Sequence, residues 1–286
     1  MRTKVGIAET YHQLTTVLQT KIPLGDFVER GIDFFTDNFA PVMNFMSAII
    51  LFIANNLSDL FLNIPALLFM VIVGAVMAWI RNWKYGLITG LAFLLMFNLG
   101  LWDETMLTLA LVLTAAFLAL LVGIPVGILA AHNNVVYIIV RPILDFMQTI
   151  PPFVYLIPAM MFFGLGRVPA VVATFIFAAP PAVRLTYLGF REIPDELLEA
   201  GYAFGANWWQ MLFKIELPAA MPSLKMGVNQ TIMMSLSMIV VAAMIGAKGL
   251  GQTVLRSLSW IDPGLGFEAG LGIVIIAIVV DRMVSE

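Results

Sequence analysis

Long apolar stretches separated by short polar breaks dominate the sequence. A bilayer core of about 30 Å requires about 20 residues of α-helix, so stretches slightly below this length predict tilted helices or helices inside a bundle. The pattern predicts an all-α, polytopic membrane protein with about seven transmembrane helices. The predicted spans are 64–80, 85–101, 105–131, 143–165, 168–182, 228–246 and 269–282.

An eighth apolar stretch, 41–53, is shorter and runs into the polar residues 55–59. It predicts a helix that lies in the membrane interface rather than a span. We therefore divide the chain into an N-terminal tail with an interfacial helix, 1–62, and a transmembrane domain, 63–286, that contains a long polar loop at 183–226. The first forty residues lack the apolar core of a signal peptide, so we expect no cleavable signal.

The composition agrees with a membrane location. Hydrophobic residues make up 61% of the chain and charged residues only 12%, and the mean hydropathy is +0.96; soluble proteins carry about twice that share of charge. A net charge of −3 without a basic cluster argues against nucleic-acid binding. Cysteine is absent, and His12 and His132 lie far apart outside the spans, so we expect no metal centre and no histidine-based catalytic site.

Basic residues occupy alternate breaks between the spans, which predicts the orientation because Lys and Arg are retained on the cytoplasmic side. The connection at Asp103-Glu104 is acidic and fits the outside. We expect the N-terminus outside and the C-terminus in the cytoplasm of a bacterial inner membrane. The basic residues that decide this are Arg81 and Lys84 after the first span, Arg141 before the fourth, and Arg184, Arg191, Lys214 and Lys225 in the loop 183–226.

The spans carry ionisable residues only at their borders, such as Asp145 and Asp281. Proton-coupled carriers usually need an ionisable group within the membrane. The chain also lacks the G-x-x-x-x-G-K-[ST] loop that binds the phosphates of ATP. If the protein drives uphill transport, another polypeptide supplies the energy.

Prolines and glycines inside the spans predict broken helices and close helix packing. Proline removes a helix hydrogen bond, so the pairs Pro151-Pro152 and Pro180-Pro181 are expected to bend or break their helices. Gly86/Gly90 and Gly123/Gly127 have the four-residue spacing that lets two helices approach closely.

The loop 183–226 contains the most specific pattern of the chain: Glu199-Ala200-Gly201, three residues, Gly205, nine residues, then Ile215-Glu216-Leu217-Pro218. Acidic residues after Pro194 suit the start of a short helix, and Gly205 is able to end it with a positive φ. The small residues permit close contact with a partner surface. Trp208, Trp209 and Phe213 then give the next segment an apolar face at the membrane boundary. A plain interfacial helix with ordinary caps is the alternative reading of the residues alone.

This spacing resembles the E-A-A, three residues, G, nine residues, I-x-L-P signature of the permeases of binding-protein-dependent ABC importers. Gly201 stands where the general signature has Ala, as is common in betaine-type permeases. Similarity to the glycine betaine/proline betaine permeases extends from about residue 22 to the end, and includes the stretches 142–152, 210–213, 227–231 and 249–252.

The resemblance implies a type I importer fold and a transport complex. Its expected members are a homodimer of this permease, two ATP-binding subunits and an external substrate-binding protein. The permease is expected to be non-catalytic and to bind no cofactor, since the ATPase subunit uses ATP and Mg. In that family the loop forms a coupling helix that docks on the ATPase subunit, and the matching residues here are Glu199, Ala200, Gly201, Gly205, Ile215, Leu217 and Pro218.

The expected cargo is a quaternary-ammonium or methylated-amine osmolyte: glycine betaine, proline betaine, choline, carnitine or trimethylamine N-oxide. Such a solute has no N–H donor on its cation, so its recognition relies on aromatic faces. Candidate residues that line the pathway are Phe146, Gln148, Phe153, Tyr155, Asn229, Gln230 and Ser235; packing and bonding between helices is the alternative role of these residues. An ion-coupled secondary carrier, a channel and a membrane scaffold without transport function remain the other readings.

Overall fold

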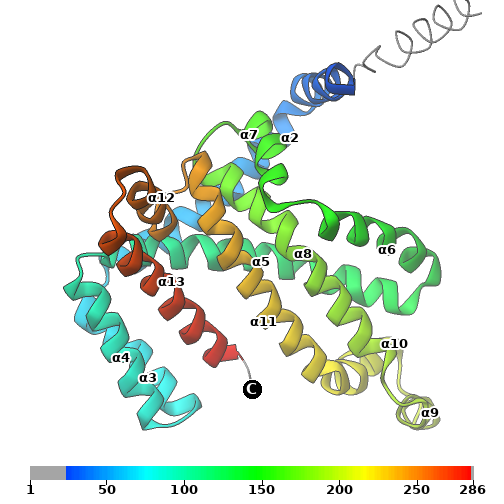
Figure 1. Cartoon of the computed structure of the whole chain (residues 1–286). Helices are drawn as coiled ribbons and strands as arrows, with labels where there is room; N and C mark the ends of the chain where they lie inside the picture. The colour runs from blue at the N-terminus through cyan, green and yellow to red at the C-terminus, as the bar shows by residue number, and fades with distance from the viewer. Residues whose placement is uncertain (1–23, 285–286) are drawn as a thin grey trace, which may run out of the picture. The chain divides into compact units, whose positions relative to one another are not determined.

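The structure is a computed structural model of the chain, and it describes residues 24–284 (Figure 1). Among these residues it contains helices, turns and no β-strand. Residues 24–43 form one unit, which is the first half of helix α2 (Leu24–Asn63), and residues 44–284 belong to a second unit. The predictions for the N-terminus, the absent signal peptide and His12 concern residues outside the described range. The domain boundary at 62/63 stays a prediction.

The second unit is a bundle of helices that surround one large apolar core. The core includes residues from α2, α3, α4, α5, α8, α11 and α13. After α2 the helices are α3 (Ala66–Ile80), α4 (Trp83–Asn98), α5 (Trp102–His132), α6 (Asn134–Thr149), η1 (Pro152–Tyr155), α7 (Leu156–Phe163), α8 (Arg167–Arg191), α9 (Asp195–Ala203), α10 (Trp208–Gln210), η2 (Met211–Glu216), α11 (Leu217–Val241), η3 (Ala242–Ile245), α12 (Leu250–Trp260) and α13 (Pro263–Val284).

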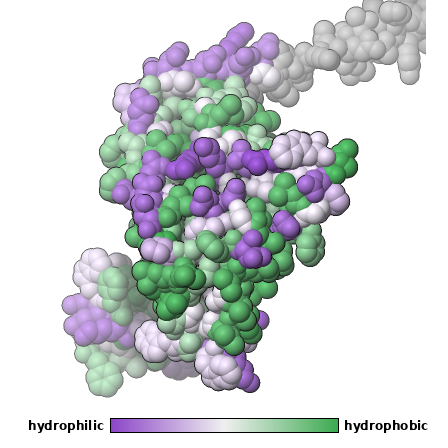
Figure 2. All heavy atoms as spheres, turned by 90° about the vertical axis from the view of Figure 1, so that its left-hand side faces the viewer, coloured by the Kyte–Doolittle hydropathy of each residue, from purple (hydrophilic) through white to green (hydrophobic). Residues whose placement is uncertain are grey.

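Within residues 24–284, five or six helical segments are long and apolar enough to cross a membrane, rather than the seven predicted. Two predicted spans, 64–80 and 85–101, fall out of the count because they form α3 and α4 with only 15 and 16 residues, and the segment Thr36–Asn63, which was not predicted to span, enters it. At 1.5 Å per residue α3 and α4 are about 23 and 24 Å long, short of the ~30 Å bilayer core. They pack against each other as a helical hairpin. Figure 2 shows the side on which α3 and α4 lie, with hydrophobic side chains gathered over its lower part.

The predicted short helix 41–53 belongs to the 40-residue helix α2, so its predicted extent was wrong. The polar residues that follow it do not end the helix, and two of their side chains have hydrogen-bond partners within the described residues. Asn56 donates to the carbonyl oxygen of Phe52 at 2.6 Å, and Asn55 accepts from Arg167 at 2.8 Å. The segment Thr36–Asn63 meets the length and composition of a span.

The predicted fourth span, 143–165, is not one continuous helix. It divides into α6 and a second piece, Pro152–Phe163, and the two are bent by 109°. Ile150 is extended, with ψ of 129°, because a residue that precedes proline is disfavoured in the α region. The prediction that prolines break helices is therefore confirmed at Pro151-Pro152. Helix α8 is not broken at Pro180-Pro181, which lie inside it.

The predicted loop 183–226 is largely helical. Arg184 and Arg191 belong to α8, and an uninterrupted helical stretch from Trp208 leads into α11. Arg184 is tolerated inside the helix because it forms an ion pair with Asp145 of α6. The segment that projects from the ends of α8 and α11 is thus shortened to residues 192–207, with α9 at its centre.

Glycines determine how closely the helices approach. A Cβ atom on Gly123 would lie 2.5 Å from Cβ of Ala182, and one on Gly127 would lie 2.7 Å from the carbonyl oxygen of Val183, so the predicted close contact of α5 is confirmed and its partner is α8. Gly86 packs closely against Gly74 of α3. A Cβ on Gly90 would meet no atom of residues 24–284 within 4 Å, so the predicted packing role of Gly90 is wrong within this part of the chain.

Candidate functional site

Helix α9 carries the first half of the signature and is short because Gly205 ends it. Asp195 and Glu196 lie in its first turn. At its other end Gly205 has φ of 74°, a conformation that side chains with a Cβ disfavour. The amide of Ala206 donates to the carbonyl of Gly201 at 3.1 Å, and that of Gly205 to Tyr202 at 2.9 Å. These two bonds form a Schellman motif, which confirms the predicted role of Gly205 as the helix end.

The two halves of the signature contact each other. A Cβ on Gly201 would lie 2.5 Å from Cδ1 of Ile215 and 2.5 Å from Sδ of Met211. Gly201 therefore accommodates the side chains of the segment that returns toward the bundle. The fixed spacing between the halves has a physical basis, since it brings the glycine of α9 opposite the isoleucine of the second half.

Helix α9 is supported by a small apolar cluster that is separate from the main core. We call it the seat cluster; its buried members are Phe190, Ile193, Leu212, Ala220 and Leu224. Leu198 of α9 packs against it, as do Leu217 and residues from the end of α5. The seat cluster thus joins α9 to the ends of α5, α8 and α11.

A polar pair lies beside the seat cluster. Nε2 of His132, at the end of α5, lies 3.0 Å from Oε2 of Glu216, and Nδ1 of the same ring lies 3.0 Å from the carbonyl oxygen of Ile128. The carboxylate is buried, and the ring also contacts Phe190 edge-on at 5.9 Å. Both ring nitrogens face oxygen atoms. Hydrogen bonds at both positions require either an imidazolium beside a carboxylate or a neutral ring beside a protonated Glu216.

Sequence reasoning missed this pair. His132 was considered only as a metal ligand or catalytic residue, and Glu216 occupies the variable position of I-x-L-P. The signal that could have revealed it is the position of Glu216 between the apolar residues Ile215 and Leu217. A carboxylate that is buried with such neighbours requires a hydrogen-bond partner.

The opposite face of α9 is open to solvent and mixes acidic and apolar side chains. Glu199 and Ala200 are exposed there. Phe204 is 92% exposed and Tyr202 65% exposed, although neither was singled out from the sequence. An exposed phenylalanine at the end of a short helix has few contacts of its own and suits a partner's pocket.

The segment after α9 presents the aromatic side chains that the sequence predicted. Asn207 and Gln210 form a capping box with two hydrogen bonds of 2.9 Å, which starts α10. Trp208 and Trp209 are both more than half exposed, and Trp209 stacks on Phe213 with 5.8 Å between ring centroids. Their expected position at the membrane boundary stays a prediction.

The candidate pathway residues do not form one surface within the described chain. Phe146, Gln148 and Phe153 are exposed around the bend between α6 and η1, and Gln230 is exposed on α11. The remaining three are engaged within the chain: Tyr155 is buried and its hydroxyl donates to the carbonyl of Met147, Ser235 is buried and donates to Thr231 at 2.8 Å, and Asn229 donates to Asp281 at 2.8 Å. Their role in the pathway stays a prediction.

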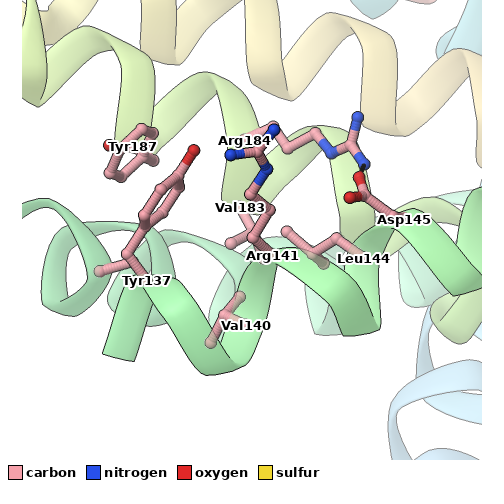
Figure 3. A pocket seen from close by; sticks show the side chains of 9 residues that line it. Tyr137, Val140, Arg141, Leu144, Asp145, Val183, Arg184 and Tyr187 are labelled. Atoms are coloured by element: carbon pink, nitrogen blue, oxygen red, sulfur yellow. Dashed lines mark hydrogen bonds and ion pairs between the residues drawn. The ribbon is translucent and has the colours of Figure 1, made fainter. Parts of the chain in front are cut away.

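A pocket of about 220 Å³ lies between α6 and α8, and none of the candidate pathway residues lines it (Figure 3). Tyr137 and Tyr187 stack there with ring centroids 4.3 Å apart, and the guanidinium of Arg141 lies 5.9 Å from the Tyr137 ring. The Arg184–Asp145 ion pair closes the other end. Two arginines and one carboxylate make the pocket net positive, which is unfavourable for the ammonium group of a cation.

The sequence of the helices that form this site matches a known family. Residues 123–284 match the family described as binding-protein-dependent transport system inner membrane component. The chain belongs to this family. The matched stretch begins within α5 and includes both halves of the signature, the seat cluster's helices and all candidate pathway residues.

Two relatives of this permease match almost its full length, and a third matches about two thirds of it. It is 45% identical over 276 residues to the glycine betaine/proline betaine transport system permease protein ProW of Escherichia coli, covering 96% of this chain and 78% of that protein. It is 44% identical to the glycine betaine transport system permease protein OpuAB of Bacillus subtilis, covering 93% and 94%. A 43% identical match over 197 residues is the trimethylamine N-oxide transport system permease protein TmoV of Pelagibacter ubique, covering 69% of this chain and 28% of that protein.

Solved structures confirm the fold of the permease. The inward-facing MetNI methionine ABC transporter matches 60% of this chain and 87% of the solved chain, with 26% identity and a TM-score of 0.56. The prediction of an all-α, multi-pass importer permease of the inner membrane is therefore confirmed. The predictions about the coupling residues, the stoichiometry of the complex and the orientation stay predictions.

Proposed function

We propose that this permease is the translocation subunit of an ATP-driven importer for a small methylated ammonium or amine-oxide osmolyte. The carrying observation is the 45% identity to a glycine betaine/proline betaine permease over 96% of the chain. Glycine betaine, proline betaine, choline, carnitine and trimethylamine N-oxide are the candidate cargoes. A carnitine cargo is supported by 45% identity to the glycine betaine/carnitine transport permease protein GbuB of Listeria monocytogenes.

In this proposal α9 transmits the motion of an ATP-binding subunit. Its exposed acidic and aromatic face docks on that subunit, and the seat cluster carries the displacement to α5, α8 and α11. ATP and Mg are used by the partner, so the permease itself is non-catalytic and binds no cofactor. The complete assembly contains two copies of the permease, two ATP-binding subunits and an external substrate-binding protein.

The orientation is part of the proposal, with the N-terminus outside and α9 in the cytoplasm. Two contacts support it. Nε of Arg81 donates to the carbonyl oxygen of Arg282 at 3.1 Å, so the basic turn between α3 and α4 lies beside the end of α13. The His132–Glu216 pair likewise joins the corner between α5 and α6 to the coupling segment. All of these ends are cytoplasmic in this orientation.

The interfacial position of α2 is proposed for residues 44–63. Asn55 bonds to Arg167, the first residue of α8, and Asn63 is followed closely by the start of α3 at Ala66. Both of these helix starts are external in the proposed orientation. Residues 55 and 63 are about 12 Å apart along a helix, so this part of α2 runs between two external helix ends, as an interfacial helix does.

The function is tested by uptake into proteoliposomes that contain the permease with its ATP-binding subunit and binding protein. Radiolabelled glycine betaine or trimethylamine N-oxide is expected to accumulate only with internal ATP, and vanadate is expected to stop the uptake. Uptake that is insensitive to vanadate but is abolished by an uncoupler would establish the alternative, an ion-coupled carrier. Accumulation of sugars or acidic amino acids in place of betaines would contradict the proposed cargo.

The orientation is tested separately with single cysteines, because the native chain has none. Trp260→Cys in α12 is expected to react with an impermeant maleimide in intact spheroplasts. Lys84→Cys at the start of α4 is expected to react only after permeabilisation. The reverse pattern would overturn the proposed orientation without affecting the proposed cargo.

A further inference from the structure

An apolar cavity of about 300 Å³ separates the α3–α4 hairpin from the rest of the bundle. Every residue that lines it is apolar. They come from the end of α2, from both helices of the hairpin, and from α5, α11 and α13. On α13 the lining residues run from Ile276 to Val284, which is a path of about 12 Å along the helix axis.

The hairpin is fixed at both ends and open between them. At one end Phe69 of α3 and Phe93 of α4 contact Trp102 of α5 edge-on, at 5.6 and 6.3 Å between ring centroids. At the other end Arg81 bonds to the carbonyl oxygen of Arg282. The cavity lies between these two attachments, so its volume is a consequence of how the hairpin is held.

It is unfavourable for this cavity to be filled with water and also unfavourable for it to be empty. Water in a protein interior needs two to four polar partners, and the lining offers no polar side chain. An empty cavity deprives its lining of dispersion contacts. In a bilayer, the abundant elongated apolar groups are the acyl chains of the lipids. The helices of this protein cross that bilayer.

We propose that the cavity binds one acyl chain of an anionic phospholipid, whose headgroup lies at the Arg81–Arg282 end. Met283 and Val284 line the cavity and directly follow Arg282. Lys84 lies in the first turn of α4, close in sequence to Arg81. Among the described residues at this end, the three basic side chains outnumber the one carboxylate, that of Asp281, so this end of the cavity carries the positive charge that a lipid phosphate requires. The lipid fills the space between the hairpin and α13 and contacts both.

Native mass spectrometry of the purified permease tests the proposal, with phospholipid retained through a delipidating wash as the readout. Val73→Phe fills the cavity from α3 and is expected to lose most of the retained phospholipid. Val71→Phe is the matched control, because the same substitution two residues away is on a side chain that is 67% exposed. It is expected to retain the wild-type amount. Equal retention in all three proteins would overturn the proposal.

The headgroup is tested with a double variant, Lys84→Gln with Arg282→Gln, against Lys225→Gln on α11 as the control. The double variant is expected to lose its preference for phosphatidylglycerol over phosphatidylethanolamine, whereas the control keeps it. Retention of a free fatty acid in place of phospholipid would overturn the assignment of the headgroup. Changed dimerisation of Val73→Phe with unchanged lipid retention would overturn the proposal in favour of a second copy that covers the cavity.

A measurement on the unmodified chain removes the question of whether a variant folds. Phosphatidylglycerol with a diazirine midway along one acyl chain is expected to cross-link to Ile276, Val279 or Val280, which are at most 7% exposed and face the cavity. Cross-links confined to the outward-facing Val274 and Ile278, which are at least half exposed, would contradict an acyl chain inside the cavity.

Discussion

Nε2 of His132 lies 3.0 Å from Oε2 of Glu216, which connects the end of α5 to the residue immediately before α11. These residues are far apart in the sequence, and the His132 ring also contacts Phe190 of the seat cluster. Glu216 is 7% exposed, so its carboxylate depends on this partner. The pair therefore fixes the second half of the signature, residues 215–218, to α5, a helix that does not belong to the signature.

Removal of either partner is expected to lower the stability of the permease. His132→Ala leaves the buried Glu216 unsatisfied, which costs about 1–3 kcal/mol. The double variant His132→Ala/Glu216→Ala is expected to be destabilised by about 1 kcal/mol less than the sum of the two single variants. Thermal unfolding in detergent measures both quantities, with the exposed Glu192→Ala as a neutral control. Strict additivity would show that the contact contributes nothing.

Gly205 is expected to be required for its backbone conformation more than for its small size. No atom of residues 24–284 lies within 4 Å of the position of a Cβ there, but φ is 74°. Gly205→Ala is expected to cost about 1 kcal/mol and to reduce uptake, because alanine disfavours this conformation. Gly205→Asn is expected to retain more activity, since Asn tolerates it.

Gly205→Leu imposes the same unfavourable backbone conformation and also adds a large side chain. It is expected to leave the protein in the membrane but to uncouple ATP hydrolysis from uptake. Comparison of ATPase activity and uptake for the three variants separates the two effects. If Asn is as harmful as Leu, close packing against the partner determines the requirement for glycine. Normal coupled transport by the Leu variant would contradict the assignment of this segment to coupling.

Phe204 is expected to anchor α9 on the ATP-binding subunit. Phe204→Ala removes a side chain that is 92% exposed, so the fold should not change. Loss of a buried aromatic anchor typically weakens an interface by about 2 kcal/mol or more, which is a roughly thirtyfold weaker association. Co-purification with the ATP-binding subunit measures it. Phe267→Ala, at a 72% exposed site of α13, is the control; equal effects of the two would contradict a specific anchor.

The crossing of α5 and α8 is expected to tolerate no side chain at Gly127. Gly127→Ala places a Cβ 2.7 Å from the carbonyl oxygen of Val183, and overpacking of this kind typically costs about 1–3 kcal/mol. The thermal midpoint in detergent should fall accordingly. Gly90→Ala, which meets no atom of the described residues within 4 Å, should leave the midpoint unchanged or raise it. An equal response at both positions would contradict the close crossing.

The linear sequence determined the features that depend on local pattern. Apolar stretches predicted the helices, because membrane helices must be apolar over most of their length. Pro151-Pro152 predicted the broken fourth span, and Gly205 predicted the end of α9, since both act through the dihedral angles of their own neighbourhood. The signature from Glu199 to Pro218 indicated the family before any contact was known.

Only the tertiary structure decided what depends on distant partners. Arg184 looked like a loop residue until its ion pair with Asp145 was known, and Pro180-Pro181 did not break α8. Glu216 occupied a variable position in the signature, yet it is bound by a histidine 84 residues earlier. Burial and pairing are properties of the packed bundle. A local pattern reports the preference of a segment, whereas the partner that satisfies a charge, or fills the space beside a glycine, is supplied by another helix.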